Sequence, residues 1–226
     1  MHCLFCNQSI TIDLNWENLF LPRTMNGLCS QCENGMEKIT GQRCRYCSRM
    51  SPDTVCRDCI LWQRKFDGDD PLTENYAIFT YGELMQAMIA KWKYRGDYAV
   101  GHAFRYAFLQ GFQKKFGKCK DFVAVPIPLS ADRYKERGFN QAQMLASFLP
   151  ANVSEALSRV SGEKQSKKTR KQRLSAQNPF RVNSPINKPV ILVDDIYTTG
   201  TTLRHAAAIL KKQGCPTVSS YTLVRG

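Results

Sequence analysis

The sequence has no long apolar run and no leader-like start, and both absences exclude classes of protein. No stretch approaches the roughly 20 apolar residues that a bilayer-spanning helix needs. The opening residues, MHCLFCNQSI, lack the basic and apolar regions of a secretory signal. We therefore expect a cytoplasmic protein, whose access to the inner face of the membrane would depend on partners. Stable disulfides are rare in that compartment.

Histidine is scarce, which leaves few candidates for acid–base catalysis. There are three, His2, His102 and His205, and only His205 follows a candidate ligand loop. A P-loop is also missing. The segment GEKQSKKT has Lys167 where a P-loop needs its second glycine, so a side chain would obstruct the phosphate nest. The sequence thus argues against a P-loop hydrolase and identifies no catalytic residue.

Acids are outnumbered by bases, and this imbalance indicates the kind of partner. The chain has 19 Asp and Glu against 32 Lys and Arg, a formal charge of +13. A hydrophobic fraction of 43% is enough for a folded core. Strong positive charge favours polyanions such as nucleic acid or phosphorylated ligands. Membrane attraction is less favoured, because no basic amphipathic helix is evident.

Cysteine, by contrast, is abundant near the start. Eight of the ten cysteines form four CxxC pairs within the first 59 residues. Two such pairs can close a tetrahedral, structural Zn²⁺ site. We predict two sites, with the third and fourth pairs sharing one ion because only eight residues separate Cys47 from Cys56. An interleaved pairing, a single site and a redox role stay open. Cys119 and Cys215 are expected to be core thiols. The predicted ligands are Cys3, Cys6, Cys29, Cys32, Cys44, Cys47, Cys56 and Cys59.

The remaining pattern predicts an α/β domain behind this cysteine-rich region. We expect a small zinc-ribbon domain over 1–62, a polar linker over 63–75 and a main domain over 76–226. Strands are predicted at 75–81, 121–130, 152–160, 190–193 and 217–225, and helices at 82–97, 99–116 and 201–214, with a turn and a helix over 131–149. Their alternation is typical of a mostly parallel sheet flanked by helices.

The segment 190–202, VILVDDIYTTGTT, predicts a ligand site at the end of a buried strand. Two acids follow the apolar stretch, and ligands of parallel sheets bind beyond the carboxyl ends of the strands. TTGTT then enters a helix, whose first N–H groups and dipole favour an anion. Carboxylates beside a phosphate site suit sugar hydroxyls or Mg²⁺. We expect a phosphorylated ribose on Asp194, Asp195, Thr198, Thr199, Gly200, Thr201 and Thr202.

This segment resembles the thirteen-residue phosphoribosyl pyrophosphate signature of type I phosphoribosyltransferases. The resemblance implies that fold for the main domain. It also implies that Asp194 and Asp195 contact the ribose hydroxyls and that the loop after them binds the 5′-phosphate. Phosphoribosyl pyrophosphate would bring Mg²⁺ with it. An active phosphoribosyltransferase acting on an unidentified base or amine is therefore one of two functions we consider.

The other function comes from a wider resemblance. KWKYRGD at 91–97, VPIPLSADRYKERGFNQAQMLA at 125–146 and TRKQRLSAQNPF at 169–180 resemble segments of the ComF family, ComFC type. Together with the cysteine-rich start and the 190–202 segment, they occur in the family's order and cover nearly the whole chain. The resemblance implies a competence protein that assists uptake of single-stranded DNA. Its implied partners are a ComFA-type DNA helicase and a recombination mediator.

Three basic segments are candidate contacts for that DNA. If the fold brings them to one face, they form a groove for a phosphate backbone, and Trp92, Tyr94, Tyr134 and Phe139 could stack bases. Alternatively, each segment is a solvated face, or the third is a lid over bound pyrophosphate. The candidates are Lys91, Lys93, Arg95, Arg133, Arg137, Lys164, Lys167, Lys168, Arg170, Lys171 and Arg173.

Overall fold

The structure is a computed structural model that describes residues 1–10, 26–94, 97–160 and 178–226. Seven of the predicted DNA contacts lie outside the described residues: Arg95, Lys164, Lys167, Lys168, Arg170, Lys171 and Arg173. Within the described ranges, no helix is long and apolar enough to cross a bilayer.

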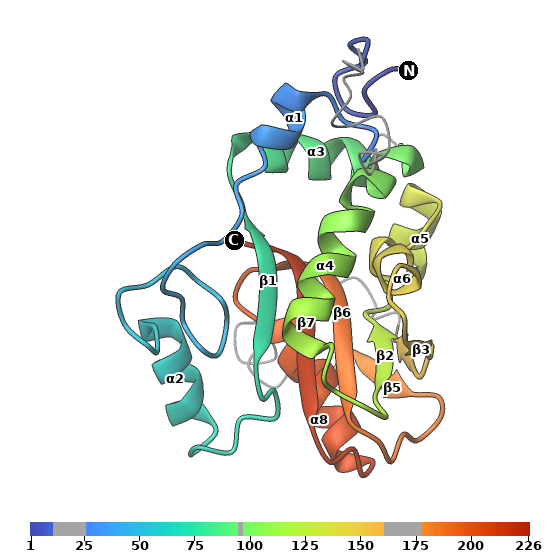
Figure 1. Cartoon of the computed structure of the whole chain (residues 1–226). Coiled ribbons are helices and arrows are strands. Elements are labelled where there is room, and N and C mark those ends of the chain that lie inside the picture. The colour runs from blue at the N-terminus through green and yellow to red at the C-terminus, as the bar shows by residue number, and fades with distance from the viewer. Residues whose placement is uncertain (11–25, 95–96, 161–177) are drawn as a thin grey trace, which may run out of the picture.

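A five-stranded parallel sheet forms the centre of the molecule (Figure 1). Its order is β1 (Asn75–Thr80), β7 (Val218–Arg225), β6 (Val190–Tyr197), β2 (Val123–Pro126) and β3 (Asn152–Val153). Strand β6 lies between β2 and β7, with Val193 opposite both Pro126 and Tyr221. The predicted, mostly parallel sheet is thus confirmed, and the acid-bearing strand is at its centre.

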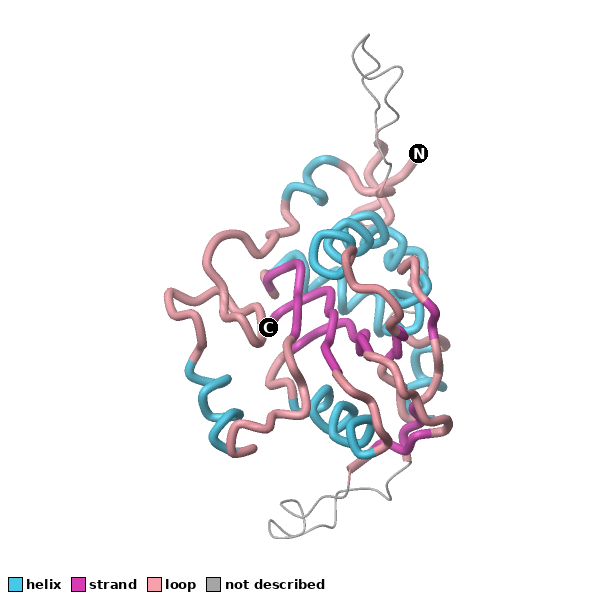
Figure 2. Tube along the Cα trace, turned by 60° about the horizontal axis from the view of Figure 1, so that its bottom comes forward, coloured by secondary structure: helices cyan, strands magenta, loops and turns pink. Residues whose placement is uncertain are grey.

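Apolar residues of β6 pack on both faces of the sheet, as expected for a central parallel strand. Ile191 and Val193 belong to the core under α3 (Glu83–Tyr94), η1 (Tyr98–Phe104), α4 (Arg105–Phe116) and α6 (Gln141–Ser147). Val190 and Leu192 belong to the core under α8 (Thr201–Lys212). Figure 2 shows helices on both sides of the strands. Strand β6 ends at Tyr197 and α8 begins at Thr201, so only a short loop separates them.

Two predicted segments differ from expectation: the helix over 99–116 has two parts, and 131–149 forms two helices where a turn and one helix were expected. The segment 99–116 is a 3₁₀ helix, η1, followed by α4. The segment 131–149 contains α5 (Ala131–Arg137) and α6, because Gly138 adopts a left-handed conformation with φ of 77°. Ser130 and Asn140 cap the two helices by accepting hydrogen bonds from backbone N–H groups. The turn brings the side chains of Arg137 and Gln141 together, so that they form a hydrogen bond.

The predicted strand 152–160 is also split, because its halves pair with different partners. β3 lies at the edge of the main sheet, whereas β4 (Leu157–Arg159) pairs antiparallel with β5 (Phe180–Val182). The sequence did not predict β5, which is only three residues long. This small second sheet carries Arg159 to the carboxyl end of β2.

The cysteine-rich region contacts the rest of the chain in two places. Its first part, with α1 (Ser30–Asn34), packs near α3, where Lys91 Nζ donates to the carbonyls of Leu4 and Phe5 at 3.0 and 2.9 Å. Its second part, with α2 (Arg57–Lys65), lies beside β1, and the N–H of Asn75 donates to the carbonyl of Tyr46 at 2.7 Å. Figure 1 shows α1 above the sheet and α2 at its left. The domain limits stay a prediction.

Candidate functional site

A cavity of about 110 Å³ lies where β2 and β6 end. Four basic side chains line it around the two acids: Lys93, Arg133, Arg137 and Arg159. Its volume is below the roughly 300 Å³ of a typical small-molecule pocket, so a larger ligand would extend toward solvent. Asp194, Asp195 and Thr202 of the predicted ligand set line this cavity.

The two aspartates have different surroundings. Asp195 is buried and pairs with Lys93 Nζ at 2.5 Å. Half-buried Asp194 accepts a hydrogen bond from the N–H of Asp195 at 2.9 Å. Burial, and then the negative charge of Asp195, raise the pKa of Asp194 to about 7. Asp194 is therefore the acid that gains most from a bound cation or hydroxyl donor.

Two buried donors in the same cavity lack partners within the described part of the chain. Arg137 and Gln141 are 8% and 1% exposed, and Arg137 Nη1 donates to Gln141 Oε1 at 3.2 Å. Neither Arg137 Nε nor Gln141 Nε2 has a hydrogen-bond acceptor among the described residues. An unsatisfied buried donor costs about 1–3 kcal/mol, more when charged. The cavity is thus suited to a ligand with acceptor atoms, such as a phosphate.

The loop between β6 and α8 depends on Gly200. This residue has a φ of 78°, and a Cβ atom there would lie 2.2 Å from Tyr197 Oη and 2.4 Å from Arg204 Nη1. Only glycine fits, and α8 begins at the next residue. Thr199 Oγ1 and Thr201 Oγ1 lie 2.9 Å apart on the exposed side of the loop. An anion on this side of the loop would meet these two hydroxyls and the first N–H groups of α8.

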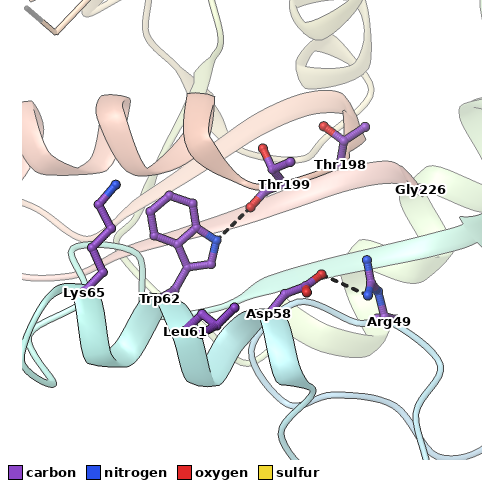
Figure 3. A pocket seen from close by; sticks show the side chains of 8 residues that line it. All are labelled: Arg49, Asp58, Leu61, Trp62, Lys65, Thr198, Thr199 and Gly226. Carbon is purple, nitrogen blue, oxygen red and sulfur yellow. Dashed lines mark hydrogen bonds and ion pairs between the residues drawn. The ribbon is translucent and has the colours of Figure 1, made fainter. Parts of the chain in front are cut away.

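A second, larger cavity of about 520 Å³ lies on the other side of this loop. Thr198 and Thr199 form one wall and α2 of the cysteine-rich region forms the other (Figure 3). Trp62 Nε1 donates to the carbonyl of Thr199 at 2.9 Å, joining the two walls. The structure thus divides the predicted ligand residues between two cavities that share the loop.

The eight paired cysteines form two groups of four, each with its sulfur atoms within 4.8 Å of one another. Within the groups, the Cys6–Cys29 and Cys47–Cys56 sulfur pairs are 3.6 Å apart. Tetrahedral zinc with Zn–S bonds of about 2.3 Å needs sulfurs about 3.8 Å apart, so both groups could hold Zn²⁺. The first and second pairs form one group, and the third and fourth form the other, as the spacing predicts.

The two unpaired cysteines differ from each other. Cys215 is buried and donates to the carbonyl of Ile186 at 2.9 Å, as expected of a core thiol. Cys119 is exposed, so the prediction that it lies in the core is wrong. The residue follows α4 in the turn that leads to β2, where the chain passes over the surface.

Most described DNA candidates have partners within the protein. Lys91 forms an ion pair with Asp97 at 3.1 Å in addition to its carbonyl contacts, and Lys93 pairs with Asp195. Arg137 is buried, whereas Arg133 is exposed at the cavity rim. Their role as DNA contacts stays a prediction.

The stacking candidates also differ in exposure. Trp92 is 0% exposed, so the expectation that it could stack bases is wrong; the ring fills the core under α3. Tyr94 and Tyr134 are 65% and 52% exposed. Only these two of the four aromatic candidates present a largely open ring, since Phe139 packs against Tyr98 with ring centroids 5.0 Å apart.

Sequence reasoning missed several residues around the loop. Arg159 gave no signal, because its strand is short and pairs in a separate sheet. From the sequence, Arg204 is only a basic residue one helical turn after Gly200, with no sign of its partner. In the structure its guanidinium is buried and binds both carboxylate oxygens of Asp70, from the predicted linker, at 2.8–3.1 Å.

Comparisons with known proteins identify what this chain is similar to. Residues 135–226 match the family model described as a phosphoribosyl transferase domain. The chain is 40% identical over 227 residues to the competence protein ComFC of Bacillus subtilis (strain 168), covering 99% of this chain and 94% of that protein. It is 34% identical to the competence protein ComFC of Streptococcus pneumoniae (strain ATCC BAA-255 / R6), covering 100% of both. The DNA utilization protein YhgH of Escherichia coli O157:H7 is 25% identical, covering 89% and 98%.

Fold and site together define an α/β protein of the phosphoribosyltransferase type with a cysteine-rich zinc-ribbon region at its N-terminus. Two relatives above 30% identity over essentially the full chain then fix the family. This chain belongs to the ComFC family of competence proteins.

Proposed function

We propose that the protein assists the uptake or processing of single-stranded transforming DNA, and that its phosphoribosyltransferase scaffold binds phosphoribosyl pyrophosphate. The observation that carries this proposal is the cavity at the carboxyl ends of β2 and β6, where four basic side chains surround Asp194 and Asp195. The names of the relatives, competence protein ComFC and DNA utilization protein, support the biological role. We propose a ComFA-type DNA helicase and a recombination mediator as partners.

The residues of the cavity suit the parts of a phosphoribosyl ligand. Asp194 and Asp195 would accept hydrogen bonds from ribose hydroxyls, and the first N–H groups of α8 would bind the 5′-phosphate. Arg133, Arg137 and Arg159 would face the diphosphate. Mg²⁺, if bound with the ligand, would neutralise diphosphate charge, and the carboxylate of Asp194 is the protein oxygen best suited to it.

The rim of the same cavity supports binding of a nucleic acid strand. Arg133, Tyr134 and Lys135 are exposed neighbours on α5. Tyr94 projects from α3, with its ring 5.5 Å from the guanidinium of Arg137. Exposed aromatic rings beside cations are the combination that binds single strands with little sequence preference. In the sequence, the basic stretch 164–173 falls between β4 and β5 and outside the described residues.

A salt titration with a labelled oligothymidylate tests the DNA proposal. The test variant replaces four residues by Gln together: Lys167, Lys168, Arg170 and Lys171. We expect weaker binding, and a slope of log affinity against log salt concentration that is smaller in magnitude by about three. The matched control replaces Lys114, Lys118, Lys120 and Lys212, which are exposed on α4, α8 and the turn before β2. Equal losses in both variants would contradict a DNA site beside the cavity.

An active phosphoribosyltransferase remains the second candidate, because the 520 Å³ cavity beside Thr198 and Thr199 has room for an acceptor. Release of pyrophosphate from isotope-labelled phosphoribosyl pyrophosphate in the presence of purine and pyrimidine bases tests it. Base-dependent release would establish the enzyme. Binding of the ligand without turnover would favour the binding protein.

A further inference from the structure

Arg225, near the end of β7, connects the second cysteine group to the loop that follows β6. Its guanidinium is only 6% exposed and lies over the ring of Tyr197, 4.9 Å from the centroid. Nη1 donates to the carbonyl of Tyr197 at 3.1 Å, and Nη2 donates to Cys47 Sγ at 3.7 Å. One side chain therefore contacts both a predicted metal ligand and the residue that begins the loop.

A second contact with the loop comes from α2, which follows the second cysteine group in the sequence. Trp62, three residues after Cys59, donates to the carbonyl of Thr199 (Figure 3). The guanidinium of Arg204 lies 4.4 Å from the Trp62 ring centroid and donates to Tyr197 Oη at 2.8 Å. Gly200 is enclosed between these groups. The loop is thus fixed at two points, and both fixing contacts come from residues next to the second cysteine group.

The charge of a metal-bound group explains why an arginine is placed here. Four thiolates around one Zn²⁺ leave about two negative charges in a buried site. Burying a guanidinium is costly unless an anion compensates it. Arg225 Nε has no acceptor among the described residues, so the sulfur and the Tyr197 carbonyl are the contacts that stabilise the buried charge. The position of Arg225 then depends on an intact, negatively charged cysteine group.

We propose that Arg225 is a positioning residue through which the second cysteine group, Cys44, Cys47, Cys56 and Cys59, sets the conformation of the phosphate loop. Metal binding at this group and anion binding at the loop then favour each other, since coupling between two sites is reciprocal. The anion half of this statement rests on the proposed phosphoribosyl site, whereas the effect of Arg225 on the loop does not.

Hydrogen exchange of the peptide that covers 198–203 tests the effect on the loop without any ligand. In the zinc-loaded full chain, we expect Arg225→Met to speed exchange about fivefold or more while zinc content stays at two per chain. Arg225→Lys keeps the positive charge and should recover part of the protection. Trp62→Phe removes the hydrogen bond to Thr199 but keeps an aromatic ring beside Arg204, and it should also speed exchange. The matched control is Arg43→Met in the same module, which loses hydrogen bonds to the carbonyls of Ile39 and of Ala77 in β1.

Unchanged exchange in Arg225→Met would overturn the proposal, whatever Trp62→Phe does. An equal effect of Arg43→Met would also overturn it, because the change would then report general loosening of the module. The coupling is tested by chelator-driven zinc release, which phosphoribosyl pyrophosphate should slow about fivefold in the unsubstituted protein but not in Arg225→Met. If the unsubstituted protein fails to bind phosphoribosyl pyrophosphate, the proposed function fails, and the exchange experiment still decides the role of Arg225.

Discussion

Replacing Asp194 by Asn should stabilise the protein while removing its ligand site. The pKa of Asp194 is raised from 3.8 to about 7 by burial and by Asp195. The folded state therefore keeps a proton that the unfolded chain releases, and stability falls as pH rises from about 4 to about 7. At 1.36 kcal/mol per unit, the charged form costs up to about 4 kcal/mol above pH 7. Water entry and local relaxation reduce this, so we expect a gain of about 1–3 kcal/mol for Asp194→Asn at pH 8.

Urea unfolding of the zinc-loaded protein between pH 5.5 and pH 8.5 measures this gain. Lower pH is avoided because protonated thiols release zinc. The advantage of Asp194→Asn should grow toward pH 7 and then level off, and in thermal unfolding it should reach about 3–8 °C at pH 8. Asp132→Asn, on the exposed side of α5, is the matched control for loss of a carboxylate. Two results would contradict a raised pKa of Asp194: a variant that is less stable than the unsubstituted protein at pH 8, or a stability difference that does not vary with pH.

The neighbouring acid should behave in the opposite way. Asp195→Asn removes the partner of Lys93, whose side chain is only 12% exposed, and leaves a largely buried ammonium unpaired. We expect a loss of about 3 kcal/mol in the same unfolding assay. Two adjacent aspartates with opposite effects on stability would show that Asp194 is not placed there for folding. A gain from both substitutions would contradict this assignment.

Three further outcomes follow from the site. Gly200→Ala should lower the free energy of unfolding by more than about 2 kcal/mol in urea, because its Cβ would meet Tyr197 Oη at a φ of 78°; a loss below 0.5 kcal/mol would contradict the geometry. Cys47→Ser should reduce zinc content, measured by mass spectrometry, whereas Cys119→Ser should not, and equal losses would argue against the grouping. Arg137→Met should weaken phosphoribosyl pyrophosphate about tenfold in calorimetry, and unchanged affinity would remove Arg137 from the site.

Much of the fold was predictable because it depends on local patterns. The apolar run Val190–Val193 predicted a strand buried on both faces, and the helix after Gly200 follows from apolar residues at helical spacing. The points at which predicted helices and strands are interrupted were harder to predict. The segment before Gly138 forms a helix of its own, where a turn and a single helix were expected, and β3 and β4 separate because each pairs with a different strand. Pairing partners distant in sequence are not encoded in the local pattern.

The site was predictable in part. The chemistry of Asp194, Asp195 and the loop could be anticipated, and so could the cysteine groups, since short spacings limit which thiols can meet. The surroundings could not. Lys93 looks like a free surface charge in the sequence but is paired with Asp195. Arg225 contacts a cysteine that is 178 positions away. Such contacts arise when separate segments meet at one edge of the sheet.

The carboxyl edge of the sheet is proposed to bind a phosphorylated pentose. Calorimetry tests this most directly: phosphoribosyl pyrophosphate with Mg²⁺ is titrated into the zinc-loaded protein and into the Asp194→Asn, Asp195→Asn double variant. We predict one ligand per chain with a dissociation constant of roughly 10 µM or tighter, equivalent to about −7 kcal/mol, and no measurable heat of binding in the folded double variant. Absence of binding to the unsubstituted protein, or equal binding to both proteins, would contradict the account.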